Sequence, residues 1–178
     1  AWDCLKKISY LNSRMQAVLE YSAMAQFNTK EEFMEGNLFD FIEEYAMNIL
    51  NRSDRLKVQV VRSDTEGIEM KFVPQNIAII LDNVVSNSTK YNANELRVLL
   101  GKDEKQYTID FIDDGDGVSS DIADLNELFE FGKGYTLTGT GVGLYHIKDI
   151  VEKDLQGTVT IESEPQKGFA LHVRFGKV

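Results

Sequence analysis

Three polar side chains fall on one stripe of a segment whose apolar spacing predicts a helix over residues 77–91. Asn83, Asn87 and Lys90 are separated by four and three residues, so a helix would place them one turn apart on one face. An Asn carbonyl oxygen is a ligand that Mg²⁺ accepts beside waters and phosphate oxygens, and a lysine ammonium can bind a phosphate. The stripe can form a metal–phosphate site, but taken alone it favours a solvated helix face.

Two glycine-rich segments would let the backbone approach a ligand closely. DDGDG at 113–117 follows a predicted strand, where a carboxylate can accept a hydrogen bond from an exocyclic amine such as that of adenine. TGTGVGL at 138–144 opens a predicted helix, and the backbone N–H groups at a helix start can hold an anion. Taken alone, the first segment favours a plain acidic turn, whereas the second favours phosphate binding over a flexible hinge. The second segment has neither the Rossmann nor the P-loop spacing.

The composition favours a globular protein that does not bind nucleic acid. The chain has 178 residues, of which 43% are apolar, and a formal net charge of −10, whereas a nucleic-acid surface needs clustered positive charge. Its single cysteine, Cys4, excludes an internal disulfide and a multi-cysteine metal site. No apolar run approaches the roughly 18 residues needed to span a bilayer. We expect a cytoplasmic fragment that makes no membrane contact itself, although its parent protein could be membrane-anchored.

Helices and strands must position these motifs. Apolar residues three and four apart predict an N-terminal helix over residues 2–28, and a second amphipathic helix follows Gly36 and Asn37. Alternation with a period of two then predicts a hairpin that turns at 64–67. The remaining predicted elements are strands at 96–100 and 107–111, a short helix at 121–129, a loop at 131–141, a helix from Leu144 to Val151 and a closing hairpin at 159–175. Together they predict an α/β two-layer sandwich with a mixed, mostly antiparallel sheet that helices cover on one face.

Together and in this order, the motifs resemble those of the Bergerat-type ATPases, the superfamily of gyrase, heat-shock chaperones, histidine kinases and MutL. The resemblance covers roughly residues 37–178. The chain matches the asparagine box with LDNVVSNSTKYN, the first glycine box with DDGDGV, the phenylalanine box with FEFGK at 129–133 and the second glycine box with TGTGVGLYHIKDIVE. Its tail, GTVTIESEPQKGFALHVRF, is similar to the last hairpin of the histidine kinase catalytic domain.

The resemblance implies two domains and a role for each matching residue. Residues 1–35 look like the second helix of a dimerisation and phosphotransfer hairpin, and residues 36–178 look like an ATP-binding catalytic domain. Asn87 would hold Mg²⁺ that bridges the ATP phosphates, Asn83 would line the same site, and Lys90 would contact a phosphate. The adenine would be flanked by Tyr91 and recognised through its amino group by Asp113.

Glycine-rich segments would complete the site that the resemblance implies. The adenine pocket would be shaped by Gly115 and Gly117, and the phosphates would be cradled by Thr138, Gly139, Thr140, Gly141, Val142, Gly143 and Leu144. Residues 118–138 would form a lid over the ATP, from which Lys133 is a candidate to reach the γ-phosphate.

The residue at position 83 separates phosphotransfer from hydrolysis. Hydrolytic branches of the superfamily carry a glutamate base four residues before the metal-binding Asn. This chain has Asn83 there, and an amide cannot accept a proton at neutral pH. Asp82 is adjacent but lies about 100° away around a helix. The pattern resembles that of the sensor histidine kinases, in which the attacking nucleophile is a histidine on another segment.

Neither His146 nor His172 follows the His-Glu/Asp pattern of a phosphoacceptor helix, so both are interpreted as structural. We therefore expect an incomplete histidine kinase that binds ATP and Mg²⁺, with the acceptor histidine upstream of this fragment. The expected partners are a response-regulator receiver domain and a second copy of the chain, bound through the N-terminal helical region. A non-catalytic ATP-binding switch module is the main alternative, and a MutL- or gyrase-like ATPase is less favoured because of Asn83.

Overall fold

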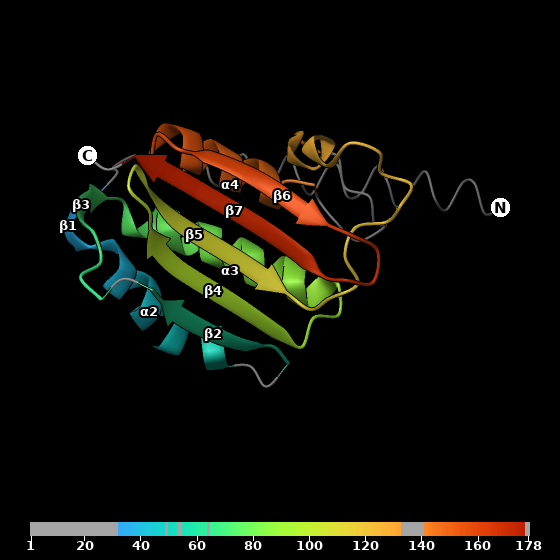
Figure 1. Ribbon diagram of the computed structural model, residues 1–178, viewed down its shortest axis with the longest axis horizontal. Coiled ribbons are helices and arrows are strands. Elements are labelled where there is room, and N and C mark those ends of the chain that lie inside the picture. Colours follow the sequence, from blue (N-terminus) through green and yellow to red (C-terminus); the bar gives the residue numbers. More distant parts are fainter. Residues whose placement is uncertain (1–31, 49, 53–54, 64, 133–140, 177–178) are drawn as a thin grey trace.

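The computed structural model describes residues 32–48, 50–52, 55–63, 65–132 and 141–176, which form one layered α/β structure (Figure 1). Its elements, with η for a 3-10 helix, are β1 (Met34–Asn37), α2 (Leu38–Asn48), η1 (Leu50–Arg52), β2 (Lys57–Arg62), β3 (Glu69–Phe72), α3 (Pro74–Lys90), β4 (Glu95–Lys102), β5 (Gln106–Asp113), η2 (Leu125–Phe129), α4 (Gly143–Lys153), β6 (Thr158–Ser163) and β7 (Phe169–Gly176).

A five-stranded sheet in the order β2-β4-β5-β7-β6 forms one layer. β2 pairs with β4 in parallel, and the other three pairings are antiparallel. The helices α2, α3 and α4 cover one face of this sheet, behind the strands in Figure 1. Side chains alternate between the two faces, so Leu96, Val98 and Leu100 of β4 are buried in the core. These findings confirm the predicted two-layer sandwich with a mostly antiparallel sheet.

The helix α3, which carries the polar stripe, confirms the prediction for residues 77–91. Pro74 occupies its first turn, where the missing N–H of proline has no helical partner to lose. Its buried residues recur three and four apart and join the core: Ile77, Ile80, Leu81, Val84 and Ser88. Lys90 lies in the last turn, where a cation interacts favourably with the helix dipole.

The hairpin predicted around residues 64–67 is wrong. β2 instead pairs in parallel with β4, with Val58 opposite Leu96. β3 joins β1 in a separate two-stranded sheet, with Phe72 opposite Met34. Alternating apolar residues indicate that a segment is a strand, but they do not indicate its partner, because pairing depends on neighbours from elsewhere in the chain.

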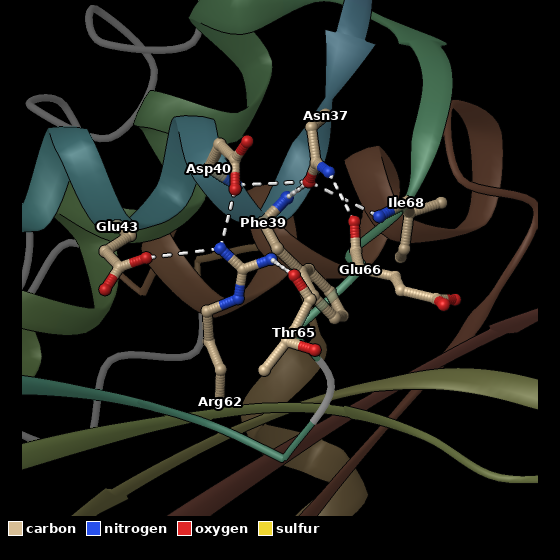
Figure 2. Close-up of polar contacts among 8 residues, drawn as sticks. All are labelled: Asn37, Phe39, Asp40, Glu43, Arg62, Thr65, Glu66 and Ile68. Atoms are coloured by element: carbon tan, nitrogen blue, oxygen red, sulfur yellow. Dashed lines mark hydrogen bonds and ion pairs between the residues drawn. The ribbon is translucent and has the colours of Figure 1, made fainter.

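Hydrogen bonds and an ion pair with the start of α2 hold the chain between β2 and β3 in place (Figure 2). Asn37 Oδ1 accepts hydrogen bonds from the backbone N–H groups of Phe39 at 3.0 Å and Asp40 at 3.2 Å, which caps α2. The same oxygen accepts the N–H of Ile68 at 3.3 Å. Arg62, the last residue of β2, pairs with Asp40 at 2.6 Å. These contacts hold the connection against α2, which keeps β3 from folding back along β2.

Further predictions concern the ends of the chain and the segment before α4. The helix predicted over residues 2–28 lies outside the described residues, so the division of the chain into residues 1–35 and 36–178 stays a prediction. The short helix predicted at 121–129 is the 3-10 helix η2. The closing hairpin is confirmed as β6 and β7. Within the described part of the chain, no helix is long and apolar enough to cross a membrane.

Candidate functional site

The carboxylate of Asp113 lies at the end of β5 and is held by three hydrogen-bond donors. Ser88 Oγ donates to Oδ2 at 2.7 Å, and the backbone N–H groups of Gly115 and Phe169 donate to Oδ1 at 3.0 and 3.2 Å. Ser88 belongs to α3 and Phe169 to β7, so helix, loop and sheet all fix this carboxylate. A carboxylate has about four acceptor positions, so one remains for an N–H group of a ligand.

Ser88 is a site residue that sequence reasoning placed only in the core. Its side chain is 1% exposed and lies on the buried face of α3. The signal for its role is a hydroxyl within an otherwise apolar stripe, because a buried hydroxyl is destabilising unless it is hydrogen-bonded. Its hydrogen bond with Asp113 joins α3 to the end of β5.

Two glycines of the acidic loop lie where a side chain would collide with backbone atoms. A Cβ on Gly115 would lie 2.6 Å from the carbonyl oxygen of Tyr91. Gly117 has a φ of 70°, which favours glycine, and a Cβ there would overlap the carbonyl oxygen of Glu164. The loop therefore packs directly between the end of α3 and the β6–β7 hairpin.

The polar stripe of α3 presents an amide and an ammonium to the site. Among the described residues, none makes a hydrogen bond with the Asn87 side chain, and no carboxylate pairs with Lys90 Nζ, which lies 5.2 Å from the centre of the Tyr91 ring. Burial lowers the pKa of Lys90. A half-buried ammonium without a counter-ion favours the binding of an anion beside it, because the anion offsets its lost hydration.

The start of α4 lies against the same stripe. Gly143 is the first residue of α4, and a Cβ on it would lie 2.7 Å from Asn83 Oδ1. Asn83 Nδ2 donates to the carbonyl oxygen of Ile79 at 2.8 Å, which leaves Oδ1 as the atom that faces α4. The backbone N–H groups and the dipole of α4 favour an anion in front of its N-terminus. The stripe and the N-terminus of α4 therefore form one anion-binding corner.

The structure brings ten of the predicted residues together around α3 and the end of β5. They are Asn83, Asn87, Lys90, Tyr91, Asp113, Gly115, Gly117, Val142, Gly143 and Leu144. Gly141 lies two residues before α4, and its carbonyl oxygen accepts the N–H of Gly132 at 3.1 Å. Val142 is 2% exposed and Leu144 packs against the core, so these two residues offer the site their backbone. The other four lie in the segment 133–140, outside the described residues, and their roles stay predictions: Lys133, Thr138, Gly139 and Thr140.

The opposite face of the sheet carries a hollow of about 480 Å³. It is lined by Gln59, Glu95, Arg97, Ile112, Asp113 and Asp114. The carboxylate of Asp113, however, bonds with Ser88 on the helical side of the sheet. We therefore place the candidate site between α3, α4 and the end of β5, because the donors and acceptors converge there.

Asp82 is turned away from the polar stripe. Both of its carboxylate oxygens accept the hydroxyl of Tyr45 on α2, at 3.0 and 3.1 Å. Burial and this hydrogen bond raise the pKa of Tyr45 to about 12. The geometry agrees with the prediction that Asp82 does not replace a base at position 83. The arrangement can thus orient an amine at Asp113 and hold phosphates at the anion-binding corner.

Known proteins share both the sequence pattern and the fold. The family model described as histidine kinase-, DNA gyrase B- and HSP90-like ATPase matches residues 72–177. The sensor protein kinase PilS of Pseudomonas aeruginosa is 27% identical over 172 residues, which cover 93% of this chain and 31% of that relative. The chain therefore spans about a third of the length of this curated relative.

Solved structures of histidine kinases have the same fold. The Acinetobacter baumannii histidine kinase AdeS matches 97% of this chain and 81% of its own chain, with a TM-score of 0.63 and 14% identity. The ATP-binding domain of PrrB from Mycobacterium tuberculosis matches 82% of this chain and 98% of its own, with a TM-score of 0.62 and 19% identity. Because the family model covers more than half of its residues, the chain belongs to the family of histidine kinase-, DNA gyrase B- and HSP90-like ATPases.

Proposed function

We propose that this chain carries the ATP-binding catalytic domain of a sensor histidine kinase, which transfers the γ-phosphate of ATP to a histidine outside residues 1–178 in two-component signalling. The family match and the similarity to a sensor protein kinase support this proposal. The observation that carries it is Asn83, which stands beside the start of α4, one helical turn before Asn87. A hydrolase of this family would need a proton acceptor at that position, and an amide is not one.

Each part of the candidate site takes one part of the nucleotide in this proposal. Asp113 accepts the adenine amine at its remaining acceptor position, and Gly115 lets the acidic loop pack against the backbone of Tyr91 beside it. Lys90 and the N-terminus of α4 hold the phosphates. The binding of a triphosphate would provide Lys90 with the anionic partner that it lacks among the described residues.

Asn87 fits a magnesium ion that enters with the phosphates. Its side-chain oxygen makes no hydrogen bond within the described residues, and Mg²⁺ accepts such oxygens beside phosphates and waters. In the same part of the chain, no group of three His, Cys, Asp or Glu side chains could hold a metal ion by itself. The ion would therefore depend on the nucleotide, and when bound it neutralises phosphate charge.

The transfer forms a bond between an imidazole nitrogen and the γ-phosphorus and breaks the bond from that phosphorus to the bridging oxygen, which leaves with ADP. The residues of this chain hold the phosphates and orient the base, and no proton must be taken from water. His172 is a poor acceptor because its Nδ1 lies 2.7 Å from Asp110 Oδ1 and its Nε2 is buried. The acceptor histidine, a receiver domain and a second copy of the chain are the proposed partners.

Labelling with γ-³²P-ATP tests this proposal. We expect the fragment to bind Mg-ATP without labelling itself, and the intact parent protein to label itself and pass the label to its receiver domain. Strong self-labelling of the fragment would contradict an acceptor outside it. ATP-dependent binding of the receiver domain without transfer would favour a non-catalytic switch. Rapid phosphate release that Asn83→Ala abolishes would favour a hydrolase.

A further inference from the structure

Asp114, the second aspartate of the acidic loop, clamps the connection between α3 and β4. Its Oδ1 accepts hydrogen bonds from the backbone N–H groups of Asn94 at 2.7 Å and Glu95 at 2.9 Å. Its own N–H donates to the carbonyl oxygen of Glu95 at 3.3 Å. The connection formed by residues 91–94 is therefore bound to the loop that follows β5, which is the loop that carries Asp113.

The connection begins with Tyr91, and Asp116, the third aspartate of the acidic loop, binds this end of it. The N–H of Asp116 donates to the carbonyl oxygen of Tyr91 at 2.9 Å. Asn92 has a φ of 63°, and its Nδ2 donates to Asp116 Oδ2 at 2.6 Å. The connection thus adopts a conformation that is uncommon for a residue other than glycine, and side chains of the acidic loop hold it there.

The clamp at Asp114 favours the ionised form of its carboxylate. The hydrogen bonds from the Glu95 and Asn94 N–H groups hold the pKa of Asp114 below its usual value. Bonds from backbone N–H groups to an ionised carboxylate are stronger than neutral ones, although exposure to solvent weakens them here. Asp114 is exposed and lines the hollow on the opposite face of the sheet, so its effect on a ligand at the candidate site must act through the connection it holds.

We infer that Asp114 is a positioning residue for the base of the nucleotide. By holding Asn94 and Glu95, it fixes the distance between Tyr91 on one side of the base and Asp113 on the other. This inference rests on the proposed ATP-binding function. The phosphates are held by Lys90 and α4, which the clamp does not touch, so Asp114 should act on binding of the base and not on binding of the phosphates.

The chain offers a matched control for this role in Asp103. Asp103 Oδ1 also accepts two backbone N–H groups, those of Lys105 at 2.8 Å and Gln106 at 2.9 Å. It is exposed, as Asp114 is, but it lies in the β4–β5 turn, at the other end of the same two strands. Asp103→Ala therefore removes the same charge and the same kind of bonds far from Asp113.

The test measures the dissociation constants of ATP and of inorganic tripolyphosphate by calorimetry, on the whole 178-residue chain, below the melting temperature of each variant. We expect Asp114→Ala to weaken ATP binding roughly 5- to 10-fold and to leave tripolyphosphate binding unchanged. The expected loss is smaller than the energy of a charge-assisted hydrogen bond, because Asp114 is exposed and acts on the base only through the connection. Asp114→Asn should restore ATP binding, because its amide oxygen can accept both N–H groups. Asp103→Ala should lower the melting temperature without changing the dissociation constant of ATP or of tripolyphosphate.

Equal ATP affinity in wild type and Asp114→Ala would overturn the inference, as would an equal loss in Asp103→Ala. Should Asp114→Ala fail to fold, Asp114→Glu keeps the charge but displaces the carboxylate, and it should weaken ATP binding while sparing tripolyphosphate. A wild-type chain that binds neither ligand would instead overturn the proposed function, and this inference with it.

Discussion

Replacing Ser88 by alanine isolates one of the three donors that hold Asp113. The substitution removes a 2.7 Å hydrogen bond to a carboxylate from a position that is 1% exposed, and it changes little else because alanine fits the space. A hydrogen bond to a charged group contributes about 1.5–3 kcal/mol to stability. Asp113 keeps two N–H donors on its other oxygen, so we expect the lower end of that range, about 1.5 kcal/mol.

For a chain of this size, such a loss lowers the melting temperature by about 3–6 °C. We also expect ATP to bind up to about tenfold more weakly, because the carboxylate that receives the adenine amine is less firmly oriented. Calorimetry of unfolding and of ATP binding measures both effects. Ser86→Ala, at an exposed position on the same helix, is the control and should change neither. Unchanged melting and unchanged affinity in Ser88→Ala would show that this hydroxyl does not hold the carboxylate.

Three other substitutions test separate parts of the account. Gly143→Ala places a Cβ 2.7 Å from Asn83 Oδ1, so we expect a loss of about 1–3 kcal/mol in stability and weaker ATP binding, both measured by calorimetry. Lys90→Met should weaken ATP and tripolyphosphate binding alike and reduce the salt dependence of both, without loss of stability in urea, since burial already disfavours its charged form. The pKa of Tyr45 is raised from 10.0 to about 12 in the folded protein. The protonated hydroxyl therefore contributes fully to stability below the pKa of the unfolded chain, and this contribution is lost as the pH rises through the pKa of the folded protein. Tyr45→Phe should therefore lose less stability than wild type between pH values of about 10 and about 12, and equal losses would contradict the Tyr45–Asp82 bond.

Local signals in the sequence were enough to predict the elements that carry the site. Apolar residues three and four apart, with Pro74 at the start, predict α3, and alternating residues predict β4, β5 and the closing hairpin. The polar residues of α3 and the acidic glycine segment are weak signals singly, because solvated helix faces and acidic turns are common. Their order along the chain then carries the resemblance to a family.

Contacts between distant segments were not predictable from the sequence in the same way. The hairpin predicted between β2 and β3 is wrong because Asn37 and Arg62 bind the intervening chain to α2, which no local pattern reveals. Ser88 has the spacing of a core residue, and only its neighbour Asp113 shows what its hydroxyl does. The clamp at Asp114 likewise depends on a connection about twenty residues earlier in the chain.

The most direct test of the central claim is calorimetric titration of the chain and of Asp113→Ala with ATP in the presence of Mg²⁺. We predict saturable binding of one ATP by the wild type and its loss in Asp113→Ala, with the variant still folded by circular dichroism. Equal binding by both chains would show that the base lies elsewhere, and no binding by the wild type would contradict the nucleotide site itself.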